Sequence, residues 1–185
     1  TLPVVGAGWI IALTGLIDDV KELSAKKKMI GILLAASLVW FLTDFRLNDF
    51  KIPFGGPLLH FEPWLSYLLT VIWIVAITNA VNLIDGLDGL VSGVSIISLV
   101  TMGIVSYFFL PVPNLFLTMT IFVLVASIAG FFPFNYHPAI LYLGDTGALF
   151  IGFMISVLSL QGLKNATAVA VVTPMIILGV PITDT

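Results

Sequence analysis

Cysteine is absent from the 185-residue chain, which excludes a disulfide framework and any metal site built from thiolates. Charge is also scarce. Charged residues make up 9% of the sequence, against about 25% in a typical soluble domain. The formal net charge is only −3, and no basic stretch is interleaved with aromatic residues, so nothing indicates a nucleic-acid partner. Together these shortages argue against a soluble globular protein.

Apolar residues fill most of the length instead: 59% of the residues are hydrophobic and the mean hydropathy is +1.17. Apolar runs fall at about 1–17, 28–43, 64–80, 89–110, 114–133, 147–163 and 166–182. Each approaches the roughly 17–25 residues that cross a bilayer as a helix. The runs are continuous rather than alternating, which favours helices over a membrane barrel. The sequence therefore predicts an all-α, multi-pass transmembrane helical bundle with about seven spans, forming one domain over 1–185 in a lipid bilayer.

The connections between these runs carry the polar residues. Threading the bilayer one helix at a time places the segments 18–28, 79–89, 135–147 and 181–185 on the same side. Four of the seven basic residues fall there: Lys21, Lys26, Lys27 and Lys28. By the positive-inside rule this side is expected to be cytoplasmic. Seven of the ten carboxylates share it: Asp18, Asp19, Glu22, Asp85, Asp88, Asp145 and Asp184.

The stretch GLIDDVKEL brings an apolar run directly into two adjacent aspartates, Asp18 and Asp19. If the helix continues through them, they lie near its C-terminal end, where the helix dipole disfavours negative charge. Two neighbouring carboxylates also repel each other. A divalent metal ion or a nearby lysine would remove both costs. The alternative is a solvated turn at the point where the chain leaves the membrane.

The stretch NAVNLIDGLDGL places a polar residue at every third position: Asn79, Asn82, Asp85 and Asp88. On a continuous helix this spacing predicts a slowly winding polar stripe. One interpretation is a ligand-binding surface, because two carboxylates at an apolar boundary are costly without a counter-charge. The other is a hydrogen-bonded seam between helices.

The stretch FNYHPAILYLGDTGALF ends at the start of another apolar run, with Asp145 or Thr146 as the expected N-cap. Free amide groups at a helix N-terminus suit a phosphate. A cap alone would account for Asp145, but it leaves Asn135, His137 and Tyr142 in the same short segment unexplained. His137 by itself is more typical of a satisfied loop histidine than of a ligand.

These three segments meet if the helices bundle with their cytoplasmic ends together. Oxygen donors without thiolates select a hard cation such as Mg²⁺ or Mn²⁺, and such a cation beside lysines suits a diphosphate substrate. A P-loop lysine motif is absent from the sequence, so ordinary nucleoside-triphosphate hydrolysis is not indicated.

Three motifs occur in order between the apolar runs: DD-x-x-x-L, N-x-x-N-x-x-DG-x-DGL and FN-x-x-PA-x-x-x-x-GDTG, with P-x-x-DT at the end. In these motifs the chain closely resembles the polyprenyl-phosphate N-acetylhexosamine-1-phosphate transferases of the glycosyltransferase 4 type, multi-pass bacterial enzymes related to the phospho-MurNAc-pentapeptide translocase. The chain begins at Thr1 rather than at a methionine, and the family's histidine-containing loop would follow Thr185. The resemblance therefore implies an internal segment that lacks N-terminal spans and this loop.

The resemblance implies transfer of a sugar-1-phosphate from a UDP-sugar to undecaprenyl phosphate, with release of UMP, on the cytoplasmic face of a bacterial plasma membrane. Mg²⁺ is the implied cofactor, with Mn²⁺ as an alternative, and a homodimer is an open expectation. By motif position Asp145 is the expected metal ligand, and Asp18 and Asp19 form the catalytic acidic pair. Either one of this pair acts as base, or the ionised lipid phosphate attacks directly, which we favour. The expected ligands of the nucleotide sugar and its diphosphate are Asn79, Asn82, Asp85, Asp88, Asn135, Tyr142 (stacked on uracil) and Lys26.

Glu22 stands where the pentapeptide translocases usually carry a lysine. This departure, with the short segment before LSAK, favours UDP-GlcNAc as donor and the first membrane step of teichoic-acid or O-antigen synthesis. Transfer of phospho-MurNAc-pentapeptide is the alternative within the family. From other classes, an ion-coupled transporter usually places its acids near the bilayer midplane, and a structural scaffold leaves the polar stripe without a purpose.

Overall fold

The structure, a computed structural model, describes residues 2–51, 58–108 and 114–163. Within them the chain forms six helices: α1 (Leu2–Lys21), α2 (Ala25–Leu42), α3 (Pro63–Leu83), α4 (Leu90–Phe108), α5 (Leu115–Asn135) and α6 (Gly144–Leu163). Two short strands, β1 (Asp49–Lys51) and β2 (Leu58–His60), pair antiparallel. The predicted span 166–182 and the segment 181–185 lie outside the described residues.

The all-α membrane bundle predicted from the apolar runs is confirmed. Five of the described helices are long and apolar enough to cross a membrane, namely α1, α3, α4, α5 and α6. The α2 helix has 18 residues and begins with Ala-Lys-Lys-Lys, so three charges fall within a stretch that barely reaches spanning length. Long lysine side chains reach the interface from such a position while their stems stay in apolar surroundings.

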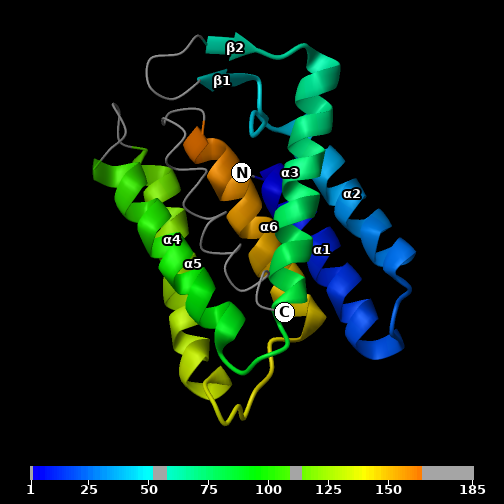
Figure 1. The fold of residues 1–185 in the computed structure, drawn as a ribbon, viewed down its shortest axis with the longest axis vertical. Helices are drawn as coiled ribbons and strands as arrows, with labels where there is room; N and C mark the ends of the chain where they lie inside the picture. Colours follow the sequence, from blue (N-terminus) through cyan, green and yellow to red (C-terminus); the bar gives the residue numbers. More distant parts are fainter. Residues whose placement is uncertain (1, 52–57, 109–113, 164–185) are drawn as a thin grey trace.

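No sequence pattern indicated the β1–β2 hairpin, which lies in the connection between α2 and α3. Each strand is only three residues long, too short for an alternating pattern to stand out. Its first cross-strand pair is Asp49 opposite His60, whose carboxylate and ring nitrogen lie 2.5 Å apart. Figure 1 shows the hairpin at one end of the bundle.

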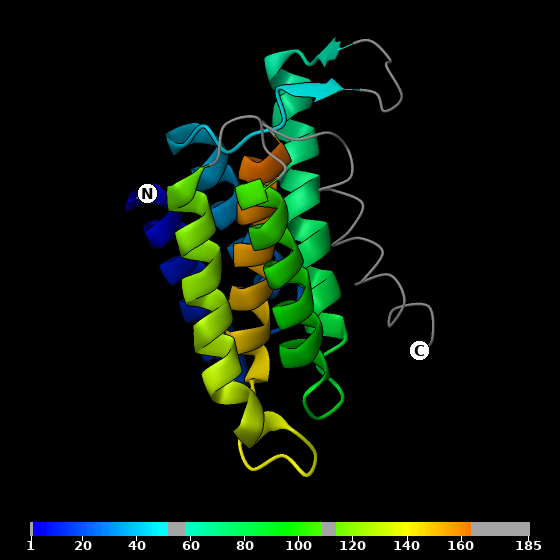
Figure 2. The same ribbon diagram turned by 90° about the vertical axis from the view of Figure 1, so that its left-hand side faces the viewer.

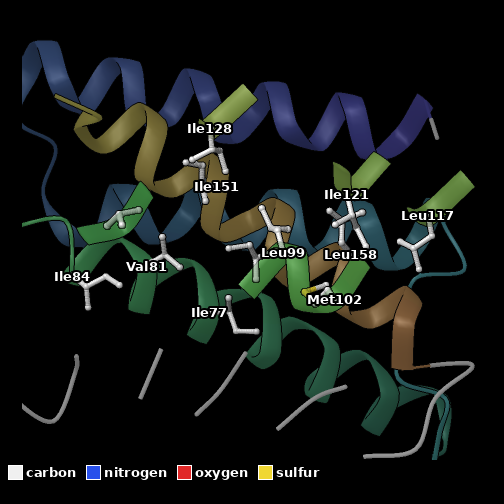
Figure 3. Close-up of a cluster of buried hydrophobic side chains, with 12 residues drawn as sticks. Ile77, Val81, Ile84, Leu99, Met102, Leu117, Ile121, Ile128, Ile151 and Leu158 are labelled. Carbon is white, nitrogen blue, oxygen red and sulfur yellow. The ribbon is translucent and has the colours of Figure 1, made fainter. Parts of the chain in front are cut away.

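The α6 helix is the centre of the bundle. It packs against α1, α3, α4 and α5, with α4 and α5 on one side and α1, α2 and α3 on the other (Figures 1 and 2). One face of α6 contributes Ile151, Ile155 and Leu158 to an apolar cluster with α3, α4 and α5 (Figure 3). The opposite face contributes Leu149, Phe153, Val157 and Leu160 to a second cluster with α1, α2 and α3. Because both faces are buried, α6 is held between the two groups of helices.

Two glycines let the backbones approach α6 closely. A Cβ atom at Gly15 on α1 would lie 2.4 Å from the Cα atom of Thr146 at the start of α6. A Cβ atom at Gly152 on α6 would lie 2.9 Å from the Cα atom of Thr78 on α3. Small residues at such crossings are how membrane helices pack closely.

The three connections that carry the polar motifs lie at the same end of the bundle, opposite the hairpin, as the threading predicts. They are the α1–α2 turn, the α3–α4 connection and the α5–α6 connection (Figures 1 and 2). The tight crossing of α1 over the start of α6 brings the first and third motifs into contact.

We expect Gly15→Ala to lower the free energy of unfolding by about 1–3 kcal/mol, because the added methyl group forces α1 away from α6. Gly6→Ala on the same helix is the matched control, since the described residues leave open space around a Cβ atom there. Thermal unfolding in detergent, followed by tryptophan fluorescence, measures both. Equal unfolding temperatures for the two variants would contradict the close crossing.

Candidate functional site

Asp19, near the end of α1, caps the N-terminus of α6. Its Oδ1 atom accepts a hydrogen bond from the Asp145 amide (2.8 Å), and its Oδ2 atom accepts one from the Thr146 amide (3.1 Å) and another from the Thr146 hydroxyl. The first amides of a helix have no partner within the helix, and a carboxylate there also opposes the helix dipole favourably. The cap was expected from Asp145 or Thr146, but a side chain from another helix supplies it.

The backbone at Gly144 accommodates this cap. Its φ angle is +65°, and a Cβ atom there would lie 3.1 Å from both carboxylate oxygens of Asp19. Glycine adopts this left-handed conformation without steric cost. The first glycine of GDTG, Gly144, therefore allows the Asp19 carboxylate to reach the start of α6.

Asp18 is buried beside this cap, with 5% of its side chain exposed. Its Oδ1 atom accepts a hydrogen bond from the Leu23 amide (2.6 Å), which fixes the α1–α2 turn. Its Oδ2 atom forms an ion pair with the Lys28 ammonium. Both oxygens of Asp18 are thus engaged within the protein, as are both oxygens of Asp19.

Lys28 joins the first motif to the third. Its Nζ atom contacts Asp18 and also lies 2.9 Å from Oδ1 of Asp145. The Oδ2 atom of Asp145 accepts no hydrogen bond from the described residues, and 34% of this side chain is exposed. Asp145 is therefore the member of the three that presents an open carboxylate oxygen.

The sequence interpretation selected Lys26 and missed Lys28. Lys26 is exposed, and the described part of the chain holds no ion pair with it. Lys28 instead shares a helix face with the buried residues Ile32, Ala35 and Val39 of α2. Its spacing of four, seven and eleven residues from them is the helical signal that would have identified it.

The spacing of the second motif predicts a polar stripe on one continuous helix, and this prediction is wrong. The α3 helix ends at Leu83, so Asp85 and Asp88 lie in the connection to α4. Gly89, with a φ angle of +72°, turns the chain before α4 begins. Only the two asparagines belong to α3, and the two aspartates are presented by a loop.

The two asparagines of α3 differ in their partners. Asn79 donates its side-chain amide to the carbonyl of Val75 on its own helix (2.9 Å). The Oδ1 atom of Asn82 is buried and accepts no hydrogen bond from the described residues. A buried polar atom without a partner is costly, so the Oδ1 atom of Asn82 is an unsatisfied acceptor near the end of α3.

Asp88 and Asn135 hold the α5–α6 connection in place. One carboxylate oxygen of Asp88 accepts from the Ala139 amide (3.1 Å) and lies 3.0 Å from Nδ1 of His137. These two contacts hold the pKa of Asp88 below its usual value, with the backbone amide as the larger cause. Asn135 is buried, accepts from the Ser92 hydroxyl (2.7 Å) and donates to the Leu141 carbonyl (3.0 Å). Both residues therefore have structural partners.

A cavity of about 180 Å³ opens between the second and third motifs. It is lined by Asp85, Gly86, Leu87, Asp88, Asn135, Tyr142, Leu143 and Gly144. The Tyr142 side chain is 75% exposed and so leaves an aromatic face available. Pockets that enclose a whole drug-sized ligand start at about 300 Å³, so this cavity suits one ring or group of a larger ligand.

Asp85 is the second open carboxylate of the site. Burial, together with the negative charges of Asp145 and Asp19, raises its pKa to about 6. This coupling places the α3–α4 connection within electrostatic reach of the start of α6. A cation at this position would favour the charged form of Asp85.

The donor set fits a hard cation such as Mg²⁺. Within the described ranges no three His, Cys, Asp or Glu side chains converge on a metal position, but Mg²⁺ usually takes only one or two carboxylates besides water and substrate phosphates. The Lys28 ammonium already occupies a cation position between Asp18 and Asp145. With its open oxygen, Asp145 is the residue best placed to hold the metal.

The sequence matches a known protein family and several curated proteins. The model of "Glycosyl transferase family 4" matches residues 1–163. A probable undecaprenyl-phosphate N-acetylglucosaminyl 1-phosphate transferase of Bacillus subtilis is 46% identical over 183 residues, which are 98% of this chain and 49% of the relative. A phospho-N-acetylmuramoyl-pentapeptide-transferase of Staphylococcus saprophyticus is 38% identical over 162 residues, 80% of this chain and 49% of the relative.

A phospho-N-acetylmuramoyl-pentapeptide-transferase of Dictyoglomus thermophilum is 32% identical over 154 residues, which are 81% of this chain and 49% of the relative. The chain thus spans about half the length of the curated relatives it matches. The matched family region contains all three polar motifs.

The raised pKa of Asp85 predicts a pH-dependent difference in stability. In the folded protein Asp85 binds its proton more tightly than in the unfolded chain, so its contribution to stability is present below about pH 4 and is lost as the pH rises through about 6. In EDTA, Asp85→Asn should therefore unfold at a higher temperature than the unmodified protein at pH 7.5. This gap should close at pH 4, and a gap that does not change with pH would contradict the assignment.

Proposed function

Because the chain belongs to glycosyl transferase family 4, we propose that the protein transfers GlcNAc-1-phosphate from UDP-GlcNAc to undecaprenyl phosphate and releases UMP. The reaction takes place at the cytoplasmic face of a bacterial plasma membrane and starts the synthesis of a cell-wall polymer such as teichoic acid. The observation that carries this proposal is the contact between Asp145 and Lys28 next to a cavity that Gly144 lines. The similarity to the Bacillus subtilis protein supports UDP-GlcNAc as donor.

In the proposed reaction a phosphate oxygen of the lipid forms a bond to the phosphorus that carries the sugar. The bond between this phosphorus and the bridging oxygen of the diphosphate breaks, and UMP leaves with the bonding electrons. A phosphate monoester is largely ionised near neutral pH, because its second pKa is about 6, so the attacking oxygen needs no base. The full engagement of both oxygens in Asp18 and in Asp19 supports direct attack.

In this proposal Asp145 would hold Mg²⁺, with Mn²⁺ as the alternative. When bound, the metal would supply positive charge that neutralises the diphosphate. Lys26, exposed at the same end, provides further positive charge for the phosphates. Asp18 and Asp19 act mainly by orienting Lys28 and the start of α6, where Asp145 lies.

The cavity is proposed to receive the uridine part of the donor. The exposed ring of Tyr142 stacks on uracil. Asp85, which lines the cavity, and Asn82, whose buried Oδ1 atom has no partner among the described residues, are the proposed acceptors for the nucleotide sugar. Asp88 and Asn135 line the same cavity and shape it through their hydrogen bonds to the α5–α6 connection. Asn79 supports the end of α3 beside them.

Two other functions have less support. Transfer of phospho-MurNAc-pentapeptide is the named activity of relatives that share 32–38% identity with the chain, against 46% for the GlcNAc-1-phosphate relative. An ion-coupled transporter is expected to hold its acids near the bilayer midplane. Here the three connections that carry the acidic residues of the motifs lie at one end of the bundle (Figure 2). A homodimer is compatible with the proposed reaction and is not needed for it.

The proposed function is tested with the full-length protein in detergent, supplied with UDP-GlcNAc, undecaprenyl phosphate and Mg²⁺. We expect UMP release that EDTA abolishes. Asp145→Asn should reduce kcat by about 10³-fold or more, because it removes charge that acts on the diphosphate in the transition state. Asp49→Asn at the opposite end is the control and should retain full activity. Absence of metal-dependent UMP release with any UDP-sugar would overturn the transferase function.

A pair of substitutions tests the stacking role of Tyr142. Tyr142→Ala should raise the KM for UDP-GlcNAc by roughly tenfold, because stacking of a base on an aromatic ring is worth about 1–3 kcal/mol. Tyr142→Phe retains the ring and should leave the KM within about twofold of the unmodified protein. If both variants behave alike, uracil does not stack on this ring.

A further inference from the structure

Lys28 contacts the carboxylate that the proposed function assigns to a metal ion. Its ammonium group forms an ion pair with Asp18 and lies 2.9 Å from the Oδ1 atom of Asp145. Only 18% of the Lys28 side chain is exposed. The neighbouring Lys27 is exposed and makes no ion pair within the described part of the chain. The two adjacent lysines thus differ in burial and in partners while carrying the same charge.

We propose that Lys28 is a built-in counter-cation that pairs with the Asp145 carboxylate in the metal-free protein, and that a divalent cation displaces it from Asp145. This inference rests on the proposed function, because it takes Asp145 as the metal ligand. Lys28 acts as a positioning residue, since it holds the carboxylate in place until the metal and substrate arrive.

The geometry explains why Lys28 releases Asp145 rather than Asp18. Asp18 is 5% exposed and is fixed on its other side by the Leu23 amide. Asp145 is 34% exposed, so its carboxylate is the one that solvent, a metal ion and a substrate can reach. An ammonium group on a flexible stem can leave one carboxylate while it keeps the other.

The surrounding charges explain why such a counter-cation is needed. Asp85 lies within electrostatic reach of Asp145 and Asp19, and Asp18 shares Lys28 with Asp145. Among the described residues, Lys28 is the cation that contacts this group. Without it, the carboxylates would repel each other in the absence of metal, and a divalent cation would meet no competitor at Asp145.

Metal affinity tests the competition in the full-length protein, in detergent and without substrates. Binding of Mn²⁺ is measured by electron paramagnetic resonance, which needs no catalytic turnover. Lys28→Gln should tighten Mn²⁺ binding about tenfold, because it removes a positive charge in contact with the ligand. Lys27→Gln removes the same charge from an exposed neighbouring position and should change the affinity by less than about twofold.

Two outcomes of this titration separate the inference from the proposed function. If Asp145→Asn loses Mn²⁺ binding but Lys28→Gln binds no more tightly than Lys27→Gln, the counter-cation role is overturned and the metal assignment stands. If Asp145→Asn binds Mn²⁺ as well as the unmodified protein does, the metal assignment at Asp145 is overturned, and the inference with it.

Amine labelling of the unmodified protein gives an independent readout that does not depend on a variant folding. Acetic anhydride should label Lys28 much less than Lys27 in EDTA, as followed by mass spectrometry. Saturating Mg²⁺ should raise the labelling of Lys28 several-fold and leave that of Lys27 unchanged. Lys28 that stays protected with Mg²⁺ bound would show that the metal does not displace it, which would overturn the proposal.

Discussion

The capping of α6 by the Asp19 carboxylate is the interaction on which the arrangement of the site depends. It joins residues 126 and 127 positions apart in the chain and places the end of α1 against the first turn of α6. An N-terminal cap is worth about 0.5–2 kcal/mol, which is modest, but its position has a large consequence. Asp145 lies in the capped turn, so the cap also sets where its carboxylate points. Gly15 and Gly144 provide the room for this contact.

The acidic residues around this contact differ in their partners. The carboxylate oxygens of Asp18 and Asp19 bind Lys28, the α1–α2 turn and the start of α6. Asp145 is partly exposed, and Asp85 lines the cavity. A metal–diphosphate site needs both kinds of group, because exposed ligands keep their geometry only when buried neighbours hold the elements that carry them. The α6 helix, buried on two faces by the apolar clusters, provides the rigid element for this purpose.

The helical bundle and the meeting of the three motifs at one end could be predicted from the sequence, because hydropathy and helix-by-helix threading depend on local composition. The roles of single side chains could not. The end of α3 at Leu83 depends on the turn before Gly89. The prediction from a polar residue at every third position therefore wrongly continued the helix through Asp85 and Asp88. The engagement of Asp19 arises from the crossing of α1 and α6, which no local pattern contains. Lys28 could have been preferred to Lys26 from the buried face of α2, and the three-residue strands were too short to recognise.

The carboxylate of Asp19 on α1 caps α6 and thereby positions Asp145. Hydrogen exchange of the backbone amides of Asp145 and Thr146, compared between the unmodified protein and Asp19→Ala in the absence of metal, measures this most directly. We expect slow exchange at both amides in the unmodified protein and clearly faster exchange in the variant, with the middle of α6 around Phe153 unchanged. Equal exchange of the two amides in both proteins would contradict it.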